Sequence, residues 1–206
     1  RGPDGPSRAM VARRRALVDG PWTWLRQVHG ARVVEVVRPG DHAGVEADAA
    51  VTAHTDAVLC ILTADCAPIS LRSPEGIRGV AHAGWKGLAD GVIEATVAAM
   101  RALGAGSIEA ALGPCIHPGC YEFSPADLDV VARRLGDSVR ASTSVGRPAL
   151  DLPNAVRVAI AGAGATLTED AAGCTACAVD ESGVPRWYSH RARADAARQA
   201  LVQWGR

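Results

Sequence analysis

The stretch 62–87, LTADCAPISLRSPEGIRGVAHAGWKG, decides the fold that we expect, because it contains two apolar runs that each end in polar residues. The first run leads into Asp65 and Cys66, and the second contains His82 and ends in a glycine-rich segment. A turn segment with proline and glycine separates the runs, so together they predict a hairpin-like pair of strands. A rigid strand pair presents reactive groups at a sheet edge, and we expect the functional site there.

Outward from this stretch, short apolar runs predict strands and periodic segments predict helices. Strands are expected within 22–37 (two, around a turn at Gly30) and at 48–52, 58–63, 69–72, 77–83 and 108–113, with strands or strand edges at 174–177, 187–191 and 198–204; helices are expected at 7–18 (with Ser7 as the N-cap), 87–103, 124–135 and 152–161. Since no repeat or linker interrupts this mixture, we expect an α/β (α+β) fold of mixed β-sheets with helices packed outside, in a single domain over 1–206.

The composition excludes several function classes. The chain of 206 residues is 48% hydrophobic and has a formal net charge of zero, so no overall field draws it to nucleic acid or to an anionic membrane. No apolar run reaches the ~20 residues of a membrane span, and no secretory signal peptide is visible. We therefore expect a cytoplasmic protein, in which the six cysteines are reduced thiols.

Three residues combine into a candidate site: His29, Cys66 and His82 each stand at the end of an expected strand or beside a glycine. A thiolate and two imidazoles can hold Zn²⁺ and leave a fourth position for water or substrate. Zinc there lowers the pKa of bound water to about 7. Alternatively, Cys66 is itself the nucleophile and a histidine is its base. The spacing alone does not separate these two chemistries.

Five motifs occur in one order along the chain: QVHG at 27–30, DAAVT at 48–52, LTADC at 62–66, AHAGWKG at 81–87 and GPCIHPGCYEF at 113–123. Together they resemble the YfiH-type family, whose members are called laccase-domain proteins, multicopper polyphenol oxidases or purine nucleoside phosphorylases. The resemblance implies a mixed α/β sandwich, like that of the cytotoxic necrotizing factor toxins, with His29, Cys66 and His82 as metal ligands. It implies zinc, or copper for the oxidase activity.

The resemblance also implies the activities. These are phosphorolysis of adenosine, inosine and methylthioadenosine, together with adenosine deamination; phenol oxidation and editing of peptidoglycan precursors are also attributed to the family. An open Cys/His/His site suits deamination, whereas phosphorolysis needs an anion site as well. The expected helix at 87–103 begins directly after AHAGWKG and predicts such a site near His82. Oxidation by several coppers would need more histidine ligands than the six in this chain supply.

Further residues receive roles. Lys86 and Arg191 are candidates to supply charge for phosphate. In the tail of the resembled family, Arg191 and Arg198 match basic positions, whereas Ala192 replaces the second arginine of a pair and Arg193 stands where an acid is usual. Asp65 is a candidate general acid or base, or a partner of a ligating histidine. The family's usual N-terminal segment has no counterpart here, which, with Ala192, puts full activity in question.

A second, weaker metal hypothesis concerns Cys115, His117 and Cys120, three good ligands in a C-x-H-x2-C pattern. The pair Cys174 and Cys177 is half of a zinc ribbon, which Cys115 and Cys120 would complete.

We expect a metal-dependent enzyme for purine nucleosides with zinc, or copper, as its cofactor. Nucleoside and phosphate are its partners, without nucleic acid or membrane, in a monomer or homodimer. A copper polyphenol oxidase, a hydrolase with Cys66 as nucleophile and an inactive binding module are the alternatives.

Overall fold

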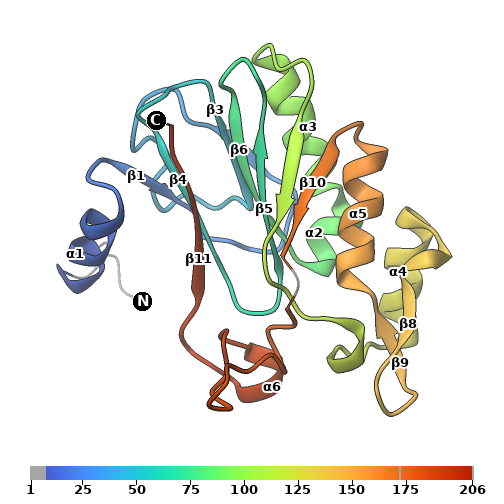
Figure 1. Ribbon diagram of the computed structural model, residues 1–206. Helices are drawn as coiled ribbons and strands as arrows, with labels where there is room; N and C mark the ends of the chain where they lie inside the picture. Colours follow the sequence, from blue (N-terminus) through green and yellow to red (C-terminus); the bar gives the residue numbers. More distant parts are fainter. Residues whose placement is uncertain (1–7, 172, 206) are drawn as a thin grey trace.

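The computed structural model describes residues 8–171 and 173–205. The expected N-cap Ser7 lies outside these residues. The described strands form a large sheet, a small sheet and a two-stranded ribbon, and the helices lie along one side of the large sheet and at the ends of the molecule (Figure 1). The α+β class with mixed sheets and outer helices is therefore confirmed. None of the described helices is long and apolar enough to cross a membrane.

The large sheet has six strands in the order β10-β7-β5-β6-β3-β2. Their bounds are Val33–Glu35 for β2, Ala49–Thr52 for β3, Ala67–Arg72 for β5, Arg78–Ala83 for β6, Glu109–Leu112 for β7 and Thr166–Asp170 for β10. β5 and β6 form the antiparallel hairpin expected from the deciding stretch, with Ala67 opposite Ala83 and Pro68 opposite His82. The pairs β2–β3 and β7–β10 are parallel, so the sheet is mixed.

The small sheet has the order β1-β4-β11, and the ribbon pairs β8 with β9. The remaining bounds are Trp22–Trp24 for β1, Val58–Thr63 for β4, Arg140–Ser142 for β8, Pro148–Leu150 for β9, Gln199–Gln203 for β11, Arg8–Leu17 for α1, Trp85–Asp90 for α2, Val92–Ala102 for α3, Pro125–Leu135 for α4, Leu152–Gly162 for α5 and His190–Arg193 for α6; short 3₁₀ turns η1 and η2 cover Pro118–Cys120 and Asp137–Val139. The two strands expected within 22–37 both form, but they belong to different sheets.

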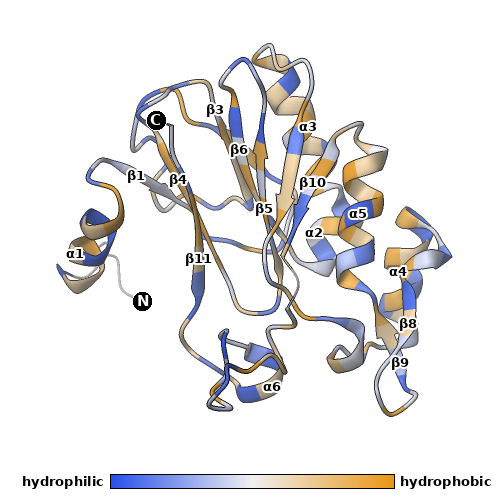
Figure 2. Ribbon diagram, viewed as in Figure 1, coloured by the Kyte–Doolittle hydropathy of each residue, from blue (hydrophilic) through white to orange (hydrophobic). Residues whose placement is uncertain are grey.

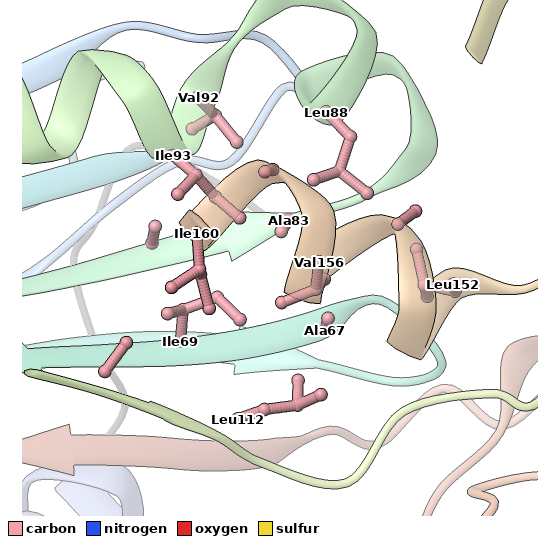
Figure 3. Close-up of a cluster of buried hydrophobic side chains, with 14 of the residues drawn as sticks. Ala67, Ile69, Ala83, Leu88, Val92, Ile93, Leu112, Leu152, Val156 and Ile160 are labelled. Atoms are coloured by element: carbon pink, nitrogen blue, oxygen red, sulfur yellow. The ribbon is translucent and has the colours of Figure 1, made fainter. Parts of the chain in front are cut away.

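The central strands β3, β5 and β6 are buried on both faces, which explains why they are mostly apolar, whereas the edge strand β10 is largely exposed. Alternate residues of β6 face opposite sides: Val80 packs with Leu59 and Ile61 of β4, whereas Ala81 belongs to the core under the helices. Figure 2 shows hydrophobic residues along the central strands and more hydrophilic ones around α6. In Figure 3, Ile69 of β5 lies against side chains of α3 and α5.

Three expectations at the level of single elements are wrong. The strand expected at 174–177 is a tight turn that begins at an isolated bridge of Cys174. The helix expected at 87–103 is two helices, because Gly91 between α2 and α3 adopts φ +86°, a left-handed conformation that ends the first helix. The strand expected at 187–191 is absent; Ser189 instead accepts a hydrogen bond from the N–H of Ala192 and caps α6. Helix α4 forms as expected, capped by Ser124.

Candidate metal centre

Three strand ends bring together His29, Cys66 and His82. His29 follows β1, Cys66 lies in the turn between β4 and β5, and His82 is on β6. A nitrogen of each histidine and the Cys66 sulfur all lie within 4.8 Å of one another. The histidine rings are 4.9 Å apart at an angle of 73°. Since His29 is exposed, Cys66 half-buried and His82 buried, the cluster runs from the surface into the sheet edge.

Gly84 makes this close approach possible. A Cβ atom on Gly84 would lie 3.0 Å from Cδ2 of His29 and 3.1 Å from Sγ of Cys66. Contacts this short would force the two side chains away from each other or from the strand. The hairpin register places residue 84 directly beyond the last paired residues, Ala67 and Ala83, which is why it meets the thiol.

Gln27 fixes the loop that carries His29. Its side-chain amide donates to the carbonyl of Leu62 at 2.7 Å and accepts from the N–H of Leu62 at 2.8 Å. The amide thus imitates one more residue of β1 beside β4, which run parallel. The loop is held to the strand that leads into Cys66, so two ligands are fixed to one element.

Asp48, directly before β3, contacts both histidines although it is not one of the three candidate ligands. Its carboxylate is buried and accepts hydrogen bonds from three successive backbone N–H groups, those of Val28, His29 and Gly30, at 3.2, 2.9 and 2.8 Å. The same carboxylate lies 2.8 Å from Nδ1 of His82. A proton on Nδ1 leaves Nε2 of His82 free as a ligand, the usual arrangement of a carboxylate behind a metal-binding histidine.

The backbone is strained on both sides of the cluster. His29 has φ +63° and Asp65 has φ +93°, values that residues with a Cβ seldom adopt. Each such residue costs about 1–3 kcal/mol and persists only where its surroundings fix it. Here the surroundings are the hydrogen bonds of Asp48 to the loop around His29, and those of the Asp65 carboxylate described below.

The electrostatics of the cluster favour a thiolate. Burial alone raises the pKa of Cys66, but hydrogen bonds from His29 and His82 and their charges outweigh it and lower that pKa to about 7. Burial lowers the pKa of His82, yet hydrogen bonds to Asp48 and to Cys66 raise it to about 9. Near neutral pH the metal-free cluster therefore pairs a thiolate with a protonated His82, and a metal ion that binds Nε2 would displace that proton.

This donor set fits a metal ion. One thiolate and two imidazoles make three of the four ligands of a catalytic zinc, and the exposed side at His29 leaves room for a fourth. Within residues 8–171 and 173–205, a second group of three potential ligands consists of Cys120, Cys174 and Cys177. Neither group has the many histidines that a centre of several coppers would need.

Comparisons with known proteins identify the family. The family model described as multi-copper polyphenol oxidoreductase laccase matches residues 6–206. The chain belongs to this laccase family. A purine nucleoside phosphorylase of Xylella fastidiosa is 40% identical to this laccase-family chain over 191 residues, 88% of the chain and 71% of the relative. Another from Streptomyces griseus is 39% identical over 176 residues, 83% and 71% of the two proteins. The crystal structure of the Bacillus licheniformis hypothetical protein YfiH superposes with a TM-score of 0.80 at 24% identity, covering 94% of this chain and 79% of that one.

Asp65 in this laccase-family chain points its carboxylate toward the C-terminal segment. One oxygen accepts hydrogen bonds from the hydroxyls of Thr175 and Ser189 at 2.8 and 2.7 Å, and the other accepts from the N–H of Arg191 at 2.7 Å. The carboxylate therefore ties two distant segments to the turn that presents Cys66. Of the roles that the sequence leaves open for Asp65, this geometry favours that of a structural carboxylate over those of an acid or base and of a partner to a histidine.

The three expected cations differ in their surroundings. The guanidinium of Arg191 donates to the carbonyl of Glu122 at 2.7 Å and lies 4.8 Å from the ring of Tyr121. Lys86 is exposed, and its ammonium group lies over the ring of Trp85, the residue that follows Gly84. Arg198 donates to carbonyls of its own loop, those of residues 195 and 197. The helix after the site, α2, has only six residues, so the expected anion site loses the long helix on which it depended.

The second cysteine cluster differs from the expected set. Cys120 lies with Cys174 and Cys177. Cys115 is buried in the main core, and His117 contributes its backbone N–H to the sulfur of Cys174 at 3.3 Å. Strand pairing between residues 115 and 174 brings the two segments together, which sequence spacing could not show.

Sequence reasoning assigned no role to Asp48, Gln27 or Gly84. Asp48 carries the clearest signal, because a carboxylate that begins a fully apolar strand needs partners when it is buried. Gln27 and Gly84 stand within the quoted motifs QVHG and AHAGWKG, but their roles depend on contacts with residues far away in the sequence.

Proposed function

We propose that this protein is a zinc-dependent enzyme that cleaves purine nucleosides by phosphorolysis at the His29–Cys66–His82 centre. The observation that carries the proposal is the Cys/His/His cluster, with His82 oriented by a buried carboxylate and one side open to solvent. The relatives named purine nucleoside phosphorylase support the choice of substrate. In this reaction an oxygen of phosphate bonds to C1′ of the ribose, the bond from C1′ to the purine nitrogen breaks, and the base leaves with a proton.

Zinc, when bound, supplies a Lewis acid that polarises an oxygen of a ligand. The protein's own residues do the rest. Asp48 holds the Nδ1 proton of His82 and keeps its ring in one orientation. The strained loop at His29 and the turn at Cys66 hold their donors in place without rearrangement when substrate binds.

Two cations are proposed to bind the phosphate. Trp85 and Lys86 directly follow Gly84, which contacts the ligands, and the ring of Trp85 is half-exposed. The rings of Trp85, Phe123 and Tyr121 form a row with edge-to-face contacts of 5.5 and 5.1 Å, and Arg191 covers its far end. Tyr121 and Phe123 are buried and support the half-exposed ring of Trp85 from below. We place the purine against Trp85, with Lys86 and Arg191 as the candidate cations for phosphate.

The test uses untagged protein, whose metal content is measured by mass spectrometry. Release of base from inosine and adenosine is then followed with and without phosphate. We expect about one zinc at this centre and phosphate-dependent base release, with both lost in Cys66→Ala and retained in Cys60→Ala. Cys60 is the matched control because it is a buried thiol in β4 outside the centre. Base release that continues in Cys66→Ala refutes the proposal.

The phosphate assignment has its own control. Lys86→Ala and Arg191→Ala are expected to raise the KM for phosphate, whereas Arg198→Ala is expected to change it least, because that guanidinium is bonded within its own loop. Deamination of adenosine and cleavage of methylthioadenosine are finer parts of the proposal. In the same assays, formation of inosine measures the deamination of adenosine, and release of adenine measures the cleavage of methylthioadenosine.

Phenol oxidation is the second candidate, favoured by the description of the family. The same protein loaded with copper and given a phenol with oxygen tests it. Oxidation that needs copper, together with no base release from nucleosides, would favour this activity over phosphorolysis. If neither activity is found, two alternatives remain: a binding module, and a hydrolase with Cys66 as the nucleophile.

A further inference from the structure

A second cluster of thiols lies apart from the centre described above and has no part in the proposed chemistry. The sulfur atoms of Cys120, Cys174 and Cys177 all lie within 4.8 Å of one another. Cys120 ends the 3₁₀ turn η1, whereas Cys174 and Cys177 share one tight turn, closed by a hydrogen bond from the N–H of Ala178 to the carbonyl of Cys174 at 2.9 Å. Two segments far apart in the sequence thus supply three soft ligands to one point.

The surroundings of the cluster suit a bound cation. The N–H of His117 donates to the sulfur of Cys174, a hydrogen bond that is stronger when the sulfur carries negative charge. Cys174 is buried, Cys120 half-buried and Cys177 exposed, so an ion could enter from solvent while one ligand stays in the core. A Cys-x2-Cys turn paired with a distant ligand segment is the arrangement of structural zinc sites.

We propose that Cys120, Cys174 and Cys177 bind a second zinc ion, which joins the loop at 114–121 to the C-terminal segment. Three thiolates leave one coordination position, for which water is available. Binding releases the thiol protons, and the three sulfurs share the charge of the ion in place of repelling one another. The odd number of thiols favours an ion over a disulfide, which would leave one sulfur without a partner.

The position of this site gives the ion a consequence for the first centre. Thr175, inside the Cys-x2-Cys turn, donates its hydroxyl to the carboxylate of Asp65 and its N–H to the carbonyl of Cys115. The N–H of Ile116 in turn donates to the carbonyl of Asp65. The second ion therefore fixes both segments that hold the strained residue directly before Cys66.

The experiment measures zinc per chain in protein purified under reducing conditions. We expect about two zinc ions in the wild type, and one each in Cys177→Ser and Cys66→Ala. Cys177→Ser is the main variant because its side chain is exposed, so the substitution removes little packing. Circular dichroism verifies that it is folded, and Cys60→Ser is the control that should keep both ions.

Cobalt supplies a readout that needs no enzyme activity. Cobalt at a site with three thiolates absorbs more strongly in the sulfur-to-metal charge-transfer region than at a site with one. This absorption should fall by the larger part in Cys177→Ser and by the smaller part in Cys66→Ala. An unchanged zinc content in folded Cys177→Ser overturns the proposal. A Cys120–Cys177 disulfide in the freshly purified wild type, with one zinc per chain, overturns it as well.

Discussion

Replacing Asp48 by asparagine tests how the metal centre is built. The two side chains have nearly the same shape, but the amide has one acceptor oxygen where the carboxylate has two. One carboxylate oxygen accepts from the N–H of His29 and from Nδ1 of His82, and the other accepts from the N–H groups of Val28 and Gly30. Whichever way the amide turns, its NH₂ group faces two of these donors.

The magnitude depends on which way the amide turns. A buried donor left without an acceptor costs about 1–3 kcal/mol. If the NH₂ group faces Val28 and Gly30, two N–H groups lose their acceptor and the free energy of unfolding should fall by about 2–6 kcal/mol; if it faces His29 and His82, only the N–H of His29 does, and the loss should be about 1–3 kcal/mol. If the amide NH₂ faces His82, it donates to Nδ1 and moves the ring proton to Nε2, which then cannot bind metal. Loss of such a partner typically weakens metal binding about 10–100-fold.

Asp65→Asn is the matched control, because Asp65 is also a buried carboxylate next to the centre with three hydrogen bonds. Two of its donors are the hydroxyls of Thr175 and Ser189, which can rotate and accept from an amide. The third donor, the N–H of Arg191, still donates to the one oxygen of the amide. Asp65→Asn should therefore cost less stability, and it leaves the tautomer of His82 unchanged.

Two measurements check these expectations. Urea unfolding of metal-free protein gives the free energies, and competition with a chelator gives the zinc affinity of the centre, both in a Cys177→Ser background so that a single site is titrated. Zinc binding by Asp48→Asn within threefold of the wild type refutes the role of Asp48. Equal losses of affinity in Asp48→Asn and Asp65→Asn refute an effect transmitted through His82.

Two further predictions concern the thiol and its neighbour. Gly84→Ala should abolish zinc binding at the first centre, since the new Cβ would lie 3.0–3.1 Å from His29 and Cys66. Gly162→Ala is the control, because its new Cβ would have no atom within 4 Å, and it should leave the zinc content unchanged. Equal zinc contents in the two folded variants would contradict this prediction. In metal-free protein, the rate of alkylation of Cys66 should rise as pH rises through about 7. Cys60, whose pKa burial raises to about 11, should stay unreactive below pH 9. Timed iodoacetamide treatment followed by peptide mass spectrometry measures both rates, and a rate for Cys66 that does not change with pH would contradict the prediction.

The closeness of Cys66 and His82 could be predicted because chemistry and local pattern agree. Cys66 and His82 flank a hairpin that its apolar runs and its turn specify, and the register then places them at one edge. The capping signals around Ser124 likewise predicted helix α4, since the residues that form a cap are adjacent in sequence. In contrast, one glycine divided the expected helix at 87–103, because periodicity reports the buried face but not the φ of residue 91.

By itself, the sequence determined the class of the fold, the hairpin at its centre and the three residues of the candidate metal centre, which all depend on residue type and local spacing. Only the tertiary structure decided which residues from distant parts of the chain contact these three and one another. Asp48 reaches both histidines because β3 pairs with β6, and Cys120 meets Cys174 because two loops cross at an isolated bridge. Such contacts arise from strand pairing between segments far apart in the chain, and no local pattern of residues encodes that pairing.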